Sequence, residues 1–184
     1  MKDGFHYSRS MLQTFPDPEL AFRRRGAAFT FDAEAFLKLV RQLRKTSVTK
    51  ADDLASVILA PSFDHAAKDP MENDICISSA ERIIILEGNY LLLDEPPWRE
   101  ISELVDEKLV CGNLSLMKVA NSIGFRWFVD ASDTVAKERV VKRHLAAGIE
   151  STKEAAEARV ERNDMLNGRL IRKYRVTPDL IIQN

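Results

Sequence analysis

The sequence predicts an α/β fold in which helices cover both faces of a parallel sheet, giving three layers. Short runs of aliphatic and aromatic residues alternate along the chain with longer segments of helical spacing, which is the pattern of parallel sheets. We expect strands at 56–60, 82–86, 127–130 and 179–183. The expected helices cover 33–45, 97–108, 133–147 and 152–166.

The first expected helix has both a start signal and an amphipathic pattern. Asp32 precedes it, and an aspartate carboxylate can accept a hydrogen bond from the free N–H groups of a first helical turn. The apolar positions then recur at helical spacing, as Ala33, Phe36, Leu37, Val40 and Leu43.

Two short apolar runs follow, at 56–60 and 82–86. They are bounded by Pro61 and Gly88, and such runs are typical of strands buried on both faces. The polar stretch 61–74 between them is expected to be a loop.

The second half of the chain repeats the alternation. Pro97 opens a helix that reaches 108, with apolar residues on one face. The strand at 127–130 is followed, after Ser132, by a helix that stops at Gly148, which together form a βα unit. An Ala- and Glu-rich helix and a last strand behind Pro178 close the chain.

Composition limits the classes of protein. At 184 residues the chain fits one domain, and its net charge of -1 provides no global attraction for nucleic acid or an anionic membrane. Cys76 and Cys111 lie far apart, so neither a disulfide framework nor a structural zinc site is indicated. The longest apolar run, 83–86, is too short to cross a bilayer, and the amino terminus lacks a signal-peptide core. We expect a cytoplasmic protein.

Two segments place carboxylates where phosphoryl-transfer chemistry could use them. Glu87 ends an apolar run, and ligands of open α/β sheets bind at the carboxyl ends of strands, so it could hold a metal or position water. A solvated turn is the alternative. Asp3 and His6 flank a glycine; Asp3 could accept a proton from a substrate hydroxyl, and His6 could contact that substrate. The alternative is a frayed amino terminus.

Basic residues gather in three places. The late helices carry Arg139, Arg143, Arg159 and Arg162, which could close over phosphates as a lid or simply form a solvated face. The run 23–25 could bind a substrate phosphate; nucleic acid is the weaker reading because no aromatic residues are interleaved. The stretch 64–69 combines Asp64 and His65 with other ionisable groups, as a ligand-contacting loop or a merely hydrophilic one.

Four motifs occur in order along the chain: Asp3-Gly4-Phe5-His6, Arg25-Gly26-Ala27 with Phe29-Thr30-Phe31-Asp32, Ala60-Pro61-Ser62-Phe63-Asp64-His65, and Leu86-Glu87-Gly88-Asn89-Tyr90. In residue type, order and spacing they resemble the phosphoribulokinase and uridine kinase family of P-loop kinases, most nearly its uridine-kinase-like branch. The resemblance covers 1–108 and 127–184. It implies a P-loop NTPase-like fold, ATP and Mg²⁺ as cofactors, and a small-molecule hydroxyl acceptor.

The resemblance also implies roles for matched residues. Asp3 would be the catalytic base, and Glu87 would belong to the metal and phosphate environment, as a ligand of Mg²⁺. The acceptor side would be lined by His6, Arg25, Asp64 and His65. A lid-like helical region at 139–168 would place Arg139, Arg143, Asn163 and Asp164 near the nucleotide.

The sequence departs from the family in two ways. It contains no G-x-x-x-x-G-K-[ST] phosphate-binding loop, so we expect an incomplete domain over 1–184 that lacks the family's first strand, P-loop and first helix. An unpaired sheet edge would then favour poor autonomous folding. The stretch 109–126 is extra relative to the family and is interpreted as an insert, either translated intron or a lineage-specific loop.

The leading functional hypothesis is an ATP-dependent kinase that phosphorylates a hydroxyl of a nucleoside, sugar or related metabolite, impaired in this chain by the missing loop. The alternative is a non-catalytic fragment or regulatory paralogue that acts through a partner. A third reading, RNA binding by the basic segments, conflicts with the near-neutral net charge. The sequence leaves the acceptor and the oligomeric state open.

Overall fold

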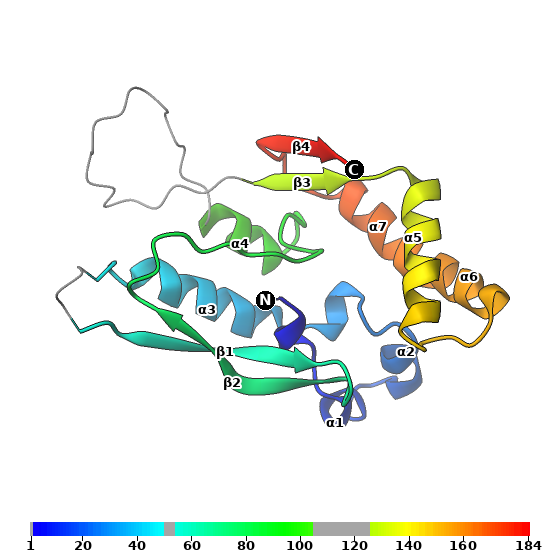
Figure 1. Cartoon of the computed structure of the whole chain (residues 1–184), viewed down its shortest axis with the longest axis horizontal. Helices are drawn as coiled ribbons and strands as arrows, with labels where there is room; N and C mark the ends of the chain where they lie inside the picture. The colour runs from blue at the N-terminus through cyan, green and yellow to red at the C-terminus, as the bar shows by residue number, and fades with distance from the viewer. Residues whose placement is uncertain (1, 50–53, 105–125) are drawn as a thin grey trace.

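A computed structural model describes residues 2–49, 54–104 and 126–184. Figure 1 shows the arrangement of its elements. In chain order they are the short 3-10 helix η1 (Lys2–Phe5), α1 (Arg9–Leu12), α2 (Pro18–Arg23), the 3-10 helix η2 (Ala28–Thr30), α3 (Ala33–Lys45), β1 (Val57–Asp64), β2 (Asp69–Ser78), α4 (Trp98–Leu104), β3 (Trp127–Asp130), α5 (Asp133–Ala146), α6 (Lys153–Arg162), α7 (Asp164–Lys173) and β4 (Leu180–Gln183).

The strands form two separate pairs. β3 and β4 pair in parallel, with Trp127 opposite Leu180, as the expected α/β sheet requires. β1 and β2 instead form an antiparallel hairpin. The predictions of a doubly buried strand at 56–60 and a loop at 61–74 are therefore wrong. Burial alternates along the first half of β1, so its pattern is that of a strand with one face covered.

The strand predicted at 82–86 is not present among the described residues, where this stretch has no regular structure. Ile83 and Ile85 are each 78% exposed. An apolar run becomes a strand only when neighbouring strands pair with its backbone and cover its side chains. No described strand pairs with this segment, and only its last residue, Leu86, packs against the main core, so its apolar character alone does not fix its conformation.

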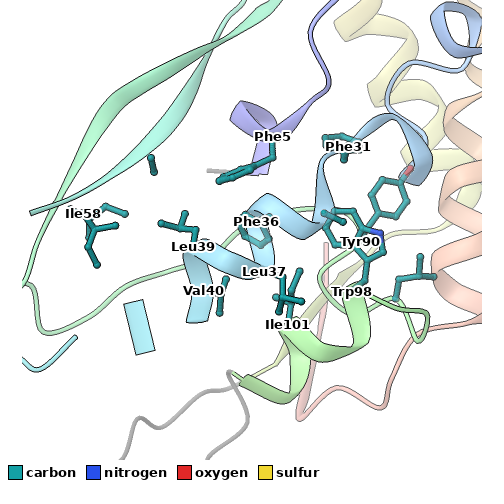
Figure 2. Packing of buried hydrophobic residues seen from close by; sticks show 14 of the residues in the cluster. Phe5, Phe31, Phe36, Leu37, Leu39, Val40, Ile58, Tyr90, Trp98 and Ile101 are labelled. Atoms are coloured by element: carbon teal, nitrogen blue, oxygen red, sulfur yellow. The ribbon is translucent and has the colours of Figure 1, made fainter. Parts of the chain in front are cut away.

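Helix α3 organises the main core, as its pattern predicted. The Asp32 carboxylate caps it by accepting a 2.8 Å hydrogen bond from the Ala35 N–H. Phe36 and Leu37 are completely or almost completely buried, and burying such a side chain contributes about 1.5–3 kcal/mol. Figure 2 shows the surrounding side chains, which come from η1, the hairpin, α4 and the loops that carry Phe31 and Tyr90, as well as from α3. They include Phe5, Phe31, Leu39, Val40, Ile58, Tyr90, Trp98 and Ile101.

Helices α5, α6 and α7 pack on one another beside this core (Figure 1). Their own cluster consists of Val141, Ala156, Val160 and Met165. Ser132 and Thr152 are the N-cap residues of α5 and α6, and their side chains accept hydrogen bonds from backbone N–H groups of the first helical turn. The single helix predicted over 152–166 is wrong, because the chain leaves helical geometry at Asn163 and begins a second helix that extends to Lys173. Asn163 is buried and bonds to a distant segment, which explains the break.

Helix α4 covers residues 98–104 of the helix predicted at 97–108, and residues 105–108 lie outside the described residues. The predicted insert at 109–126 also lies outside them, except for Arg126. None of the helices in the described part of the chain combines the length and apolar character that a bilayer crossing requires.

Candidate active site

The amino-terminal motif and the hairpin motif meet in space. A Cβ added to Gly4 would lie 2.1 Å from the Pro61 carbonyl oxygen, so only glycine permits this close approach of η1 to β1. The His6 ring then stacks on Phe31 at 4.0 Å between centroids and lies 5.0 Å from Phe63. Three of the four sequence motifs therefore contribute to one cluster of side chains.

His6 has a fixed orientation at the edge of this cluster. Its Nδ1 donates a 2.8 Å hydrogen bond to the backbone carbonyl of Asp3, which can only accept. Asp3 itself is exposed. The bond therefore holds the imidazole next to the segment that presents the predicted catalytic base.

Arg25 occupies the border between this cluster and the hairpin turn. Its side chain is 14% exposed, and its guanidinium donates to the Asp69 carboxylate at 2.9 Å, to the carbonyl of Tyr7 at 3.1 Å and to the carbonyl of Lys68. Asp69 and Lys68 belong to the hairpin. Two of these three hydrogen bonds therefore hold the hairpin turn, and the role of Arg25 toward a substrate stays a prediction.

Asp64 and His65 lie at the tip of the hairpin. The Asp64 carboxylate accepts hydrogen bonds from the N–H groups of Ala66 and Ala67, at 2.7 and 3.1 Å, and these bonds lower the pKa of the carboxyl group below its ordinary value. His65 is exposed, and its ring lies 5.2 Å from that of Phe63. Phe63 thus connects both predicted histidines to the same cluster.

Glu87 is exposed and stands three residues before the buried Tyr90. No group of three His, Cys, Asp or Glu side chains in the described part of the chain is close enough to form a metal site by itself. Mg²⁺ in kinases is commonly held by one or two carboxylates together with phosphates and water, so an accessible Glu87 carboxylate fits a share in such a site.

A hydrogen-bonded network joins three segments that are distant in sequence. The Arg24 guanidinium donates to the side-chain oxygens of Asn163 and Asn167, at 2.9 and 3.0 Å. The amide groups of these asparagines reach back to the carbonyls of Arg25 and Gly26, at 3.3 and 3.4 Å. Asn163 was a candidate from the sequence, and Arg24 belongs to the basic run 23–25 that was considered for a substrate phosphate, but Asn167 was not among the candidate site residues.

The predicted lid residues do not gather at one point. Arg139 and Arg143 are exposed on α5. Asp164 instead lies beside the buried His144, with Oδ2 3.8 Å from Nε2. Burial raises the pKa of Asp164, which His144 and nearby arginines oppose.

A cavity of about 510 Å³ lies next to the cluster, a size typical of small-molecule sites. Four aromatic side chains line it together with charged and polar groups, and two of these residues, Tyr7 and Phe31, are close to His6 along the chain or in space. Burial raises the pKa of Tyr7, with Asp32 and Glu34 acting in the same direction. The sequence did not predict this cavity because its walls come from separate segments. The aromatic and charged lining residues are Tyr7, Phe29, Phe31, Trp98, Arg24, Glu34 and Glu95.

Comparison with known proteins places the chain in a family. An ATP-dependent kinase-like protein of Aspergillus versicolor, notR', is 42% identical over 174 residues, which are 95% of this chain and 88% of that protein. The crystal structure of Saccharomyces cerevisiae YFH7, described as a proposed P-loop kinase with a circular permutation, superposes with a TM-score of 0.78 at 34% identity. The chain belongs to the P-loop kinase family. No family model matches the sequence.

Other P-loop kinase relatives are longer than this chain. A proposed uridine kinase of Schizosaccharomyces pombe is 41% identical over 181 residues, covering 98% of this chain and 66% of that protein. The superposition with YFH7 covers all of this chain and 56% of the YFH7 chain. This P-loop kinase chain therefore spans between about half and two thirds of the length of these two relatives.

Proposed function

We propose that the protein is an ATP-dependent small-molecule kinase of the uridine-kinase-like branch, which transfers a phosphoryl group to a hydroxyl of a nucleoside, sugar or related metabolite. The observation that supports this is the meeting of η1 with the hairpin, which brings His6, Phe31 and Phe63 together beside a cavity of ligand size. Phosphoryl transfer depends mainly on positioning and on charge stabilisation, so a rigid acceptor cluster is what this chemistry needs.

In this proposal each site residue predicted from the sequence has a catalytic, binding or positioning role. Asp3 accepts the proton of the acceptor hydroxyl, and its exposed carboxylate is accessible to a substrate. His6 and His65, which both lie next to Phe63, contact the acceptor, with Asp64 and Arg25 supporting the hairpin tip. Glu87 contributes a carboxylate to bound Mg²⁺, whose chemistry is to neutralise charge on the nucleotide phosphates.

The helical region 139–168 is proposed to act as the lid. Arg139 and Arg143 are exposed on α5, so they are accessible to phosphates without disrupting the helix packing. Asn163 and Asp164, at the junction of α6 and α7, tie this region to the chain near Gly26 and to His144.

The 184 residues contain no G-x-x-x-x-G-K-[ST] motif, whose amides and lysine hold nucleotide phosphates in P-loop enzymes. We therefore propose that these residues by themselves bind ATP weakly and turn over slowly. The same observation favours the second candidate, a non-catalytic fragment or paralogue that acts through a partner.

One experiment separates the two candidates. Titration of Mg²⁺-ATP into the purified chain measures nucleotide binding, and ADP release in the presence of nucleosides, sugars and vitamin-like alcohols measures turnover. Acceptor-dependent ADP release that Asp3→Asn lowers by at least about 100-fold, with ATP binding retained, supports the kinase. Asp74→Asn on the exposed side of β2 is the matched control and is expected to leave turnover unchanged. Absence of both binding and turnover favours the non-catalytic candidate.

A further inference from the structure

A second cavity, of about 370 Å³, lies where α2 meets the helices of the predicted lid. Its lining is dominated by arginine: four of the lining residues are arginines, and Glu150 is the single acidic residue among them. The full lining consists of Leu20, Arg23, Arg24, Glu150, Arg159, Arg162 and Asn163. An excess of positive charge in a hollow with protein walls concentrates its field on whatever enters.

Arg24 forms the inner wall of this cavity and is held rigidly. Its Nε and one terminal nitrogen donate to Asn163 and Asn167, whose side chains are buried. Both partners are neutral amides, and no described carboxylate forms an ion pair with Arg24. These bonds use two of the five N–H groups that a guanidinium carries. The positive charge of Arg24 is therefore ordered in advance but not neutralised.

The guanidinium group of Arg159 also has a donor without a hydrogen-bond partner in the described residues. The nearest oxygen of Glu150 is 3.6 Å from its Nη1, which is too long for a hydrogen bond. Its Nε is buried and has no hydrogen-bond partner in the described part of the chain. A buried donor without an acceptor costs about 1–3 kcal/mol, and Arg159 has no hydrogen-bonded ion pair to Glu150 that would offset this cost.

Arg24 also lines the larger, aromatic cavity next to the His6 cluster. The two cavities thus share this residue. A small molecule that extended past Arg24 from the larger cavity would bring an anionic group to the arginines of the second one. Phosphate suits this arrangement, because guanidinium groups bind phosphate oxygens in a bidentate manner and several arginines can share its two charges.

We propose that this arginine-lined cavity binds a phosphate group already carried by the acceptor, so that the acceptor is a phosphorylated metabolite. This inference rests on the proposed function, because only a kinase has an acceptor. The binding site itself can be tested without any kinase activity. Since Arg24 also lines the larger cavity, which lies beside the predicted acceptor residue His6, the phosphate is assigned to the acceptor and not to ATP.

The test uses calorimetric binding of ribose 5-phosphate, inorganic phosphate and ribose to the full chain in the absence of nucleotide. We expect ribose 5-phosphate and phosphate to bind and ribose not to bind. Arg159→Gln and Arg162→Gln should each weaken ribose 5-phosphate binding by about tenfold or more, as expected for loss of one charge-assisted hydrogen bond. Arg169→Gln, which removes the same charge from exposed ion pairs on α7, should change it less than about twofold.

Arg24→Lys provides a further readout, because it keeps the charge and loses the planar fork that bonds Asn163 and Asn167. If it remains folded by circular dichroism, it should also weaken ribose 5-phosphate binding. Equal binding by wild type, Arg159→Gln and Arg162→Gln would overturn the proposal, as would a site that responds only to ADP. If ribose 5-phosphate binds as expected but the chain shows no kinase turnover, the proposed function alone is overturned.

Discussion

The hydroxyl of Tyr90 donates a 2.6 Å hydrogen bond to the backbone carbonyl of Gly26. Tyr90 is completely buried, and burial raises its pKa far above the ordinary value, so the phenol remains a neutral donor. The bond joins the segment that follows Glu87 to the turn that follows Arg25. The position of one candidate motif therefore depends on the other.

Tyr90→Phe should lower the free energy of unfolding by about 1–3 kcal/mol, because the part-buried Gly26 carbonyl would keep only the longer 3.4 Å bond from Asn167. Urea denaturation of both proteins measures the difference. Tyr174→Phe is the control, since this tyrosine is 43% exposed, and its effect should stay within about 0.5 kcal/mol. Equal losses in the two variants would show that the Gly26 bond is not the cause.

Gly4→Ala should disrupt the contact between η1 and the hairpin. The added methyl would lie 2.1 Å from the Pro61 carbonyl oxygen, which is backbone and cannot rotate away. Overpacking of this kind costs about 1–3 kcal/mol or more and should displace Asp3 from the cluster. Thermal denaturation followed by circular dichroism reports the loss.

Gly168→Ala is the matched control for that substitution. Gly168 lies within α7, and a Cβ built there meets nothing within 4 Å. Alanine favours a helix interior over glycine by about 0.8–1.0 kcal/mol, so this variant should be more stable than wild type. A destabilised Gly168→Ala together with an unaffected Gly4→Ala would contradict both packing arguments.

Local signals in the sequence predicted the elements that local physics determines. The cap at Asp32 and the spacing of Phe36, Leu37 and Val40 fixed α3 within its observed bounds. The hairpin was missed because Pro61 looked like a strand end. In the structure Pro61 sits at a shift of register between Ala60 and Ser62, where a ladder hydrogen bond is not required of it.

The site was predictable only where its motifs are contiguous. The resemblance grouped His6 with the 60–65 segment, and the structure does bring His6 close to Phe63. The Arg24 network could not be anticipated, because Arg24 and Asn167 are 143 residues apart and a charged donor paired with a neutral amide has no sequence signature. Such pairing depends on how the helices pack.

Replacing exposed isoleucines should improve solution behaviour. Ile83 and Ile85 are each 78% exposed, and Trp127 and Val129 of β3 are 59% and 58% exposed. Large exposed apolar side chains promote association and bind apolar dyes. The double substitution Ile83→Lys with Ile85→Lys should reduce dye fluorescence and raise the concentration at which the chain remains monodisperse in light scattering.

Ile58→Lys provides the contrasting control. This isoleucine is 6% exposed and belongs to the main core, so a lysine there should unfold the chain or lower its stability by several kcal/mol. If the double lysine variant at 83 and 85 were as damaging as Ile58→Lys, the exposure of this segment would be refuted.

The pair His144 and Asp164 should make stability depend on pH. Burial lowers the pKa of His144, with Arg159 and Arg143 adding to that effect and Asp164 and Glu150 opposing it. In the unfolded chain the imidazole titrates near its ordinary value of 6.5. As pH falls through that value, the unfolded chain takes up a proton that the folded chain does not. Stability from this group is therefore present above about pH 6.5 and lost below it.

His144→Gln isolates this contribution, because it removes the titrating group and leaves Asp164 in place. Between about pH 7.5 and about pH 5.5 the wild type should lose more unfolding free energy than the variant. Asp164→Asn should retain that loss, or increase it, since the carboxylate opposes the lowered pKa of His144. Parallel stability curves for wild type and His144→Gln would mean that His144 binds its proton equally well in the folded and unfolded chains, which would contradict a lowered pKa in the folded chain.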